Sequence, residues 1–310
     1  MASEFKHFLR QSSIPDKFDE KTTEVRGFIQ SQIQNNRRVV VVTSGGTKVP
    51  LESKTVRYLD NFSVGSRGST STEYFHKEGY AVIFLHRKGS LRPYQRHLTH
   101  QNFLDILQVN PETTPNIPRV SVKPQYENDI IKTLSIYKSI REQNMLCEIE
   151  FQTLSEYLQL LHICSLALEE VGNKGLMYLA AAVSDFYIPK EEMPQHKIQS
   201  SSGPLQISLQ LVPKMLSPLV KEWAPSVFVV SFKLETDKSI LVSKAKSALN
   251  NYKHQVVVAN LLETRKKEVI LVTKDSEEVI QLTDTDINNG KEIEEIIVQQ
   301  LKTKHNQFCS

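Results

Sequence analysis

The chain has 310 residues, of which 39% are hydrophobic and 24% are charged, and these proportions are ordinary for a globular protein. This length permits one large domain or two smaller ones. The 38 basic and 35 acidic residues leave a net charge of only +3, so no large electrostatic field indicates nucleic acid or a membrane as a partner.

The cysteines and the apolar runs favour a cytosolic protein. Cys147, Cys164 and Cys309 form no C-x-x-C pair, which argues against a disulfide framework or a zinc site and suits a reducing compartment. Residues 1–21 are polar and carry both signs of charge, unlike a signal peptide. The longest apolar run, residues 176–183, is far shorter than the ~20 residues that span a bilayer.

The first 36 residues are expected to form a helical lead-in, because apolar residues recur in them at helical spacing. The clearest of these positions are Val25, Phe28, Ile29 and Ile33. Residues 38–43 follow, and their β-branched side chains predict a strand buried on both faces, as in a parallel sheet covered by helices. Gly45 and Gly46 then allow the backbone to turn sharply beside a ligand.

Strands and helices alternate along the rest of the chain. Further buried strands are expected at residues 80–85, 145–151, 176–182, 226–232 and 255–260. Helices are expected at residues 69–78, 126–143, 153–171, 214–223, 237–252 and 287–301, and a hairpin at 268–273 and 278–282. This order predicts a doubly wound, mostly parallel, Rossmann-like α/β sheet, with residues 37–310 forming a single domain.

Two segments break this rhythm. Residues 86–145 are expected to be an insertion, which is irregular and rich in proline up to about residue 125. Residues 187–203 follow the end of a strand, where the active sites of open α/β sheets lie. Residues 205–211 then alternate strictly between apolar and polar, which predicts a strand with one buried face outside the main sheet, in a hairpin or at a subunit contact.

Five groups of candidate site residues lie at or soon after the expected carboxyl ends of strands, the edge at which open α/β sheets bind ligands. The groups are residues 43–47, 60–68, 178–186, 231–236 and Asn260. Ser63, Gly65 and Gly68 have the spacing of a glycine-rich phosphate loop that opens a helix, although neither an intact dinucleotide fingerprint nor a Walker A loop is present. Each group alone also fits a structural role, as a tight turn, a helix cap, a core aromatic residue or a hydrogen bond within the protein.

The nine histidines show no metal-ligand spacing and have no suitably placed cysteine partner, so no metal held by protein ligands is expected. Magnesium bound to the phosphates of a nucleotide is nevertheless expected, because this ion needs few protein ligands.

Several longer strings resemble those of phosphopantothenate–cysteine ligase, the phosphopantothenoylcysteine synthetase of coenzyme A biosynthesis. They are VVTSGGTKVPL (41–51), VRYLDNFS (56–63), YLAAAVSDF (178–186), EMPQHKIQS (192–200), SFKLETD (231–237) and VVVAN (256–260). The likeness runs from about residue 36 to the C-terminus and is to the free-standing eukaryotic form. The flavin-dependent decarboxylase domain that many bacteria fuse to this ligase is therefore not implied.

The resemblance implies a homodimeric enzyme that joins 4'-phosphopantothenate and L-cysteine while ATP is cleaved to AMP and pyrophosphate through an acyl-adenylate. ATP is implied by the likeness to eukaryotic members, and CTP, which bacterial members use, stays an alternative. Implied nucleotide-binding residues are Gly45, Ser63, Gly65, Gly68, Phe232 and Asn260. Implied contacts of phosphopantothenate are Asn61, Ala181, Ala182, Asp185 and, from the neighbouring subunit, Arg57. Asn61 and Lys197 would be catalytic, with Lys197 on a mobile loop that approaches the nucleotide phosphates.

One departure and two rival interpretations bear on this hypothesis. Val64 stands where the family string usually has a second serine, which puts a hydroxyl contact in doubt but not the glycine geometry. A nicotinamide-dependent reductase would need an intact Gly-x-Gly-x-x-Gly or a Tyr-x-x-x-Lys pair, and the chain has neither. A nucleotide-binding scaffold without turnover would need a broken set of site residues, whereas Asn61, Asp185 and Lys197 are all present.

Overall fold

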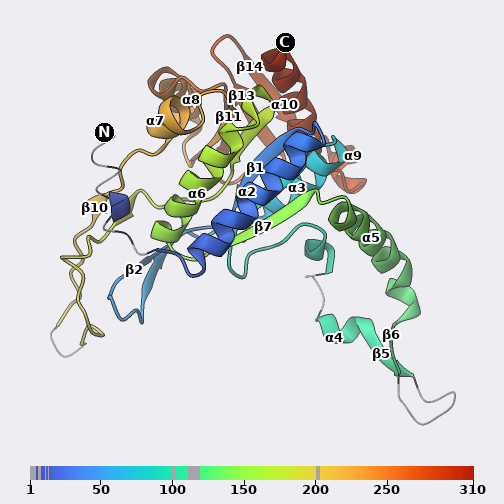
Figure 1. The fold of residues 1–310 in the computed structure, drawn as a ribbon, viewed down its shortest axis with the longest axis horizontal. Helices are drawn as coiled ribbons and strands as arrows, with labels where there is room; N and C mark the ends of the chain where they lie inside the picture. Colours follow the sequence, from blue (N-terminus) through green and yellow to red (C-terminus); the bar gives the residue numbers. More distant parts are fainter. Residues whose placement is uncertain are drawn as a thin grey trace.

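The computed structural model describes residues 5, 8–10, 12, 14–98, 102–110, 119–199 and 203–310. Its centre is an eight-stranded sheet between layers of helices (Figure 1). The strand order is β14 (Glu277–Gln281), β13 (Glu268–Val272), β12 (Val256–Leu261), β11 (Phe228–Glu235), β8 (Gly175–Leu179), β1 (Val39–Ser44), β4 (Ala81–Arg87) and β7 (Leu146–Phe151). Parts of the expected lead-in and of the 187–203 segment lie outside the described residues.

The strands from β12 to β7 run parallel, whereas β13 and β14 form the expected antiparallel hairpin at one end of the sheet. Strand β1 lies between β4 and β8, with Val42 paired to Phe84 on one side and to Tyr178 on the other. All six residues of β1 are buried, as predicted for a central parallel strand. The carboxyl ends of the six parallel strands therefore meet at one edge of the sheet.

Helices cover both faces of the sheet, so the doubly wound α/β prediction is confirmed. Helices α2 (Phe18–Gln34) and α6 (Leu154–Glu169) pack on one face, and α3 (Ser66–Lys77) and α10 (Ile293–Cys309) on the other (Figure 1). Helix α8 (Lys238–Tyr252) packs against β12. Among the described residues, no helix combines the length and the apolarity that crossing a lipid bilayer requires.

The apolar stripe predicted for α2 is only partly confirmed. Val25, Phe28 and Ile29 are buried, but Ile33 is 39% exposed. Gln32 occupies the buried position instead, and its amide donates to the carbonyl oxygen of Asn144 at 2.7 Å. A glutamine is tolerated there because this hydrogen bond satisfies its buried polar group, which periodicity alone does not reveal.

The described part of the segment between β4 and β7 is more regular than predicted, and residues 99–101 and 111–118 of the expected insertion lie outside the described residues. It contains a short 3-10 helix (Gln95–Leu98), helix α4 (Phe103–Ile106), an antiparallel pair β5 (Leu107–Asn110) and β6 (Arg119–Val122), and helix α5 (Pro124–Glu142). Neither of the described prolines of the excursion, Pro93 and Pro124, interrupts an element, and Pro124 is the first residue of α5, where no N–H is needed. The β5–β6 pair and α4 project away from the sheet (Figure 1).

The seven-residue strand predicted at 205–211 is wrong. Only β10 (Gln210–Leu211) is a strand, and it pairs with β9 (Phe186–Tyr187) outside the main sheet. The expected buried face is partly exposed at each of its four apolar side chains. These are Leu205 (51% exposed), Ile207 (40%), Leu209 (36%) and Leu211 (66%).

Three further boundaries differ from the predictions. Strand β8 ends at Leu179, so the three alanines follow it rather than complete it. The helix predicted at 214–223 is a short turn, α7 (Leu216–Pro218), followed by one π-helical turn (Leu219–Trp223). The last predicted helix is divided into α9 (Asp284–Asn288) and α10, because Gly290 adopts a φ of 73° that no helix accommodates.

Replacing Thr153 with alanine is expected to lower the free energy of unfolding by about 1 kcal/mol. Thr153 Oγ1 accepts the N–H of Glu156 at 3.3 Å, and Glu156 Oε2 accepts the N–H of Thr153 at 3.4 Å, which caps α6. Thr303→Ala is the matched control, because the exposed hydroxyl of Thr303 donates a hydrogen bond to Gln299 O within the same helix and caps no helix end. Guanidinium denaturation measures both variants, and equal losses would contradict the capping role.

The free energy of unfolding is expected to fall as the pH drops from about 6.5 towards 4. Burial lowers the pKa of His76, His86, His254 and His305 to about 4, so these rings stay neutral in the folded chain while the unfolded chain takes up protons. At about 1.4 kcal/mol per pKa unit, each ring contributes up to ~3 kcal/mol that is present above pH 6.5 and lost below it.

Denaturation at pH 7 and pH 5.5 tests this pH dependence. His86→Phe is the informative variant, because the ring stacks on Phe84 and its Nε2 has no hydrogen-bond partner among the described residues. It should flatten the pH dependence, whereas His196→Gln, at an exposed position, should leave it unchanged. An unchanged slope in His86→Phe would refute the role of this ring.

Candidate functional site

The turn after β1 is bonded directly to the segment after β8. The N–H of Ala182 donates to Gly45 O at 2.8 Å, and the N–H of Thr47 donates to Ala182 O at 3.0 Å. The hydroxyl oxygens of Thr43 and Thr47 accept the N–H groups of Ala181 (3.0 Å) and Ser184 (2.9 Å). Two of the predicted groups, 43–47 and 178–186, therefore form one structure at the carboxyl edge of the sheet.

Asn61 joins the same structure through the hairpin of β2 (Lys48–Pro50) and β3 (Tyr58–Asp60). Its N–H donates to Thr47 O at 3.1 Å, and its side-chain amide lies 3.5 Å from Val183 O. A Cβ on Gly46 would lie 1.6 Å from Asn61 O, so only glycine permits this approach. Gly46 was recognised as part of a tight turn, but its role in seating Asn61 was not visible in the sequence.

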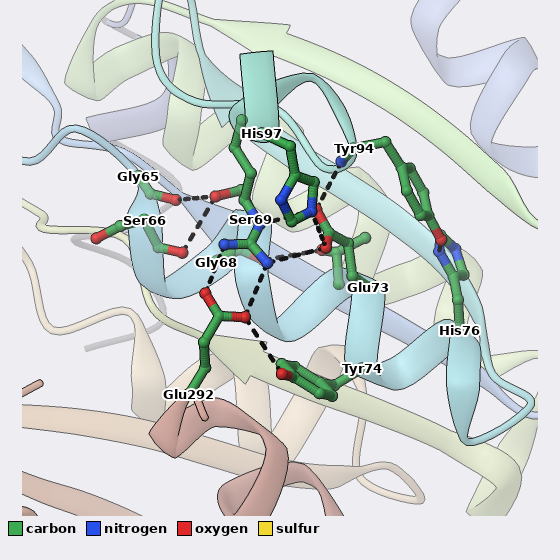
Figure 2. A network of polar contacts seen from close by, with 12 residues as sticks. Gly65, Ser66, Gly68, Ser69, Glu73, Tyr74, His76, Tyr94, His97 and Glu292 are labelled. Atoms are coloured by element: carbon green, nitrogen blue, oxygen red, sulfur yellow. Dashed lines mark hydrogen bonds and ion pairs between the residues drawn. The ribbon is translucent and has the colours of Figure 1, made fainter. Parts of the chain in front are cut away.

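The predicted phosphate loop packs against the end of β1. Gly65 has a φ of 82° and precedes α3, and Ser44 Oγ donates to Gly65 O at 3.1 Å. A Cβ on Gly68 would lie 2.5 Å from Ser44 Oγ, so both glycines bring α3 close to β1. Figure 2 shows Gly65 and Gly68 at the beginning of α3. The first turn of α3 carries no acidic residue, and a helix N-terminus of this kind suits an anion.

Strand β11 continues to Glu235, beyond the end expected at residue 232, so Phe232 lies within it, one residue past the pairing of Ser231 with the last residue of β8. Asn260 is the last residue but one of β12. The ring of Phe232 packs edge-on against Tyr178, with 4.9 Å between ring centroids, and Tyr178 OH is 2.8 Å from Ser71 Oγ of α3. The half-buried Phe232 thus lies on the α3 side of the sheet. The side-chain amide of Asn260 donates to Lys233 O at 2.8 Å. This is a hydrogen bond within the protein, the structural role that the sequence left open for Asn260.

A pocket of about 320 Å³ opens between the ends of β8 and β11. Ala181, Asp185 and Phe232 are among its lining residues, and most of the rest, including Tyr157 and Leu161 of α6, comes from the face of the sheet opposite α3. Asp185 is exposed, and its carboxylate accepts from the ammonium of Lys214 at 3.2 Å. Lys214 lines the same pocket and was not recognised in the sequence, where a lone lysine before a helical stretch carries no signal.

Arg57 and Lys197 belong to a separate group around the tip of the β2–β3 hairpin. The 194–199 loop is bonded to this tip, with the N–H of Ser53 donating to Pro194 O at 2.8 Å. Arg57 donates to the buried carboxylate of Glu52 in its own chain at 2.7 Å. Burial opposes ionisation of Glu52, but the N–H groups of Val56 and Arg57 and the Arg57 side chain hold its pKa below the usual value. Lys197 is exposed on this loop.

An ion pair next to Asn61 was missed. Arg87 ends β4, and its Nη1 lies 2.5 Å from the Oδ1 of Asp60, the residue that precedes Asn61. The Nε of Arg87 is buried and has no partner among the described residues. The available signal was a cation that follows His86 at the end of a mostly apolar strand, and charged residues are also common where a strand reaches solvent.

These features define a doubly wound α/β protein in which a glycine-rich loop, a helix N-terminus and a pocket meet at the carboxyl edge of the sheet. The chain is 49% identical over 272 residues to phosphopantothenate–cysteine ligase of Homo sapiens, covering 88% of each chain. It belongs to the phosphopantothenate–cysteine ligase family.

Other comparisons agree with this membership. The family model described as DNA/pantothenate metabolism flavoprotein C-terminal domain matches residues 158–302. The chain is 37% identical over 332 residues to phosphopantothenate–cysteine ligase CAB2 of Saccharomyces cerevisiae, covering 99% of this chain and 87% of that protein. A solved structure of a Cab2 mutant in complex with phosphopantothenate-cysteine superposes with a TM-score of 0.89, at 38% identity and 98% coverage of both chains.

Proposed function

We propose that this chain joins 4'-phosphopantothenate to L-cysteine, forming 4'-phosphopantothenoyl-L-cysteine for coenzyme A biosynthesis, and that ATP is cleaved to AMP and pyrophosphate. The observation that carries the proposal is the hydrogen-bonded structure that seats Asn61 and Ala181–Ala182 against the Gly45–Gly46 turn. It lies beside the start of α3 and beside a pocket lined by Asp185, which suits two substrates that must react with each other.

A carboxylate is a poor electrophile, so amide formation needs a good leaving group on it. The carboxylate oxygen of phosphopantothenate attacks the α-phosphorus of ATP, and pyrophosphate leaves with the bonding electrons. The amine of cysteine then attacks the acyl carbon, AMP leaves, and the amine gives up a proton to the medium. Both steps place negative charge on oxygen atoms, which preorganised hydrogen-bond donors stabilise.

The donors in this proposal are the amide of Asn61 and the N–H groups around Gly65 and Gly68. The ammonium of Lys197 would join them by a movement of the 194–199 loop away from the hairpin tip. An amide suits the position beside the reacting carboxylate because it donates hydrogen bonds without adding a group that titrates. The start of α3 would hold the triphosphate, and Ser63 Oγ, which accepts the Gly65 N–H at 3.3 Å, supports the loop that presents these donors. Phe232 would flank the base, as an aromatic ring on the α3 side of the sheet.

Magnesium would arrive with the nucleotide. Asp60, which precedes Asn61, and Asp185, which lines the pocket, already lie in ion pairs with Arg87 and Lys214. The ion would therefore be bound chiefly by phosphate oxygens and water, as Mg²⁺ commonly is. Bound in this way, it would neutralise part of the phosphate charge.

A pyrophosphate-release assay tests the proposal. Purified protein is mixed with phosphopantothenate, cysteine, Mg²⁺ and either ATP or CTP, and each reaction is compared with one that lacks cysteine. We expect more product with ATP than with CTP, and no phosphopantothenoylcysteine when cysteine is omitted. Absence of pyrophosphate with both nucleotides would refute the ligase.

We further propose that the enzyme is a cytosolic homodimer in which residues 37–310 act as one domain. Arg57 would reach the phosphate of phosphopantothenate in the neighbouring subunit, and the exposed apolar side chains between Leu205 and Leu211 would be covered by that subunit. Sedimentation equilibrium should give a mass of two chains at working concentration. A mass of one chain would contradict the shared site.

A further inference from the structure

Arg96, Glu73 and Glu292 form an ion-pair network, here called the Arg96 cluster, on the outer side of α3. Nε and Nη2 of Arg96 donate to the two carboxylate oxygens of Glu73 at 2.8 and 2.9 Å. Nη1 and Nη2 donate to the two oxygens of Glu292 at 2.6 and 2.9 Å. Figure 2 shows Glu73 and Glu292 facing a common centre, with Tyr74 and His97 beside them. One guanidinium thus engages both carboxylates in bidentate geometry.

The Arg96 cluster is largely withdrawn from water. The side chains of Glu73 and Arg96 are only 9% and 13% exposed, and that of Glu292 is 33% exposed. Burial opposes the charge of Glu73, but hydrogen bonds from His97 and Arg96 lower its pKa to about 2, so the carboxylate stays ionised. Buried ion pairs of this kind are often no more stabilising than apolar packing of similar volume.

The Arg96 cluster joins three elements that are distant in sequence. Glu73 belongs to α3, Glu292 immediately precedes α10, and Arg96 belongs to the 87–98 segment that follows β4. The same segment adds two further contacts to Glu73: the N–H of Tyr94 donates to its Oε1 at 2.6 Å, and His97 Nε2 lies 2.9 Å from its Oε2. One end of the 87–98 segment is therefore fastened to the middle of α3.

The other end of this segment lies against the proposed phosphate loop. The N–H of Leu91 donates to Val64 O at 2.9 Å. The Cβ of Ser90 lies 3.1 Å from the place where a Cβ on Gly65 would be, and 3.3 Å from the equivalent place on Gly45. The 87–98 segment thus packs against the turn at Gly45 and against the loop at Gly65.

We infer that Arg96 is a positioning residue for the nucleotide, which acts with Glu73 and Glu292 to hold the 87–98 segment against the loop at residues 63–68. This inference rests on the proposed nucleotide-binding role of that loop. Arginine is required because its planar guanidinium holds two carboxylates at once, whereas a lysine ammonium is a single point of charge. Without the Arg96 cluster, the loop at residues 63–68 would still form, but its N–H groups would be held less precisely, which weakens phosphate binding.

The test compares Arg96→Lys and Glu292→Gln with Arg92→Ala. Both cluster variants keep a polar side chain and are chosen because complete removal of Arg96 endangers folding. Arg92 lies in the same segment, but its side chain is 42% exposed and its nearest carboxylate contacts, Glu148 and Glu150, lie at 3.8 and 4.0 Å. Binding of ATP with Mg²⁺ is measured by calorimetry, and KM is measured for each substrate.

We expect the Kd and KM for ATP to rise about tenfold or more in both cluster variants, whereas the KM for phosphopantothenate and for cysteine change by about twofold or less. Arg92→Ala should resemble the wild type. Cluster variants that melt like the wild type and bind ATP equally well would overturn the inference, and so would an equal rise in KM for all three substrates. Wild-type protein that binds ATP but releases no pyrophosphate would refute the proposed ligase, while the binding comparison would still decide the role of Arg96.

Discussion

Replacing Asn61 with alanine is expected to slow formation of phosphopantothenoylcysteine by about a hundredfold or more, because one preorganised donor is typically worth about 3–4 kcal/mol in a transition state. The fold should survive, since the contacts that seat this residue are made by its backbone: its N–H on Thr47 O and its carbonyl against Gly46. Pyrophosphate release at saturating substrates measures the loss. The KM for ATP should change little, because Asn61 is proposed to act on the acyl-adenylate and not on nucleotide binding.

Two variants sharpen this prediction. Asn61→Asp keeps the shape of the side chain but removes the N–H donors and adds a negative charge, so it should be at least as slow as alanine. Asn289→Ala removes an exposed amide at the end of α9 and should leave turnover unchanged. If Asn61→Ala turned over at a near-normal rate, Asn61 would have no part in the chemistry.

Replacing Gly46 with alanine is expected to reduce turnover by about a hundredfold or more, because a shift of about 1 Å in a reacting group is enough for such a loss. The new Cβ would lie 1.6 Å from Asn61 O and 2.8 Å from Asn61 C, and both are backbone atoms. The β2–β3 hairpin must therefore move and take Asn61 with it. The same strain is expected to lower the free energy of unfolding by about 1–3 kcal/mol.

Gly27→Ala is the matched control for this variant. Gly27 lies on the exposed face of α2 with nothing within 4 Å of a Cβ, so alanine fits and favours the helix by up to about 1 kcal/mol. Activity and thermal unfolding are measured on both variants. The seating role of Gly46 would be contradicted if Gly46→Ala kept wild-type turnover, or if Gly27→Ala lost as much activity.

The main sheet could be predicted from the sequence because its strands are recognisable locally. Residues 39–42 and 81–85 are continuous apolar runs of a length typical of strands buried on both faces, and parallel pairing follows from the helices between them. The predictions were wrong where the secondary structure of a segment depends on pairing with a distant strand. The alternating residues 205–211 have the pattern of a strand, but in the part of the chain that the structure describes only Gln210 and Leu211 pair with another strand.

The candidate site divides in the same way. The α/β class and the edge at which ligands are expected could be predicted from the sequence, because buried strands, glycine pairs and polar residues at strand ends are recognisable locally. The roles of the candidate residues stay predictions. Only the tertiary structure decided that Gly46 seats Asn61, that Arg87 pairs with Asp60, and that Arg96 joins Glu73 to Glu292. These contacts join residues that are distant along the chain, and a hydrogen bond or an ion pair depends on distances that neither composition nor periodicity contains.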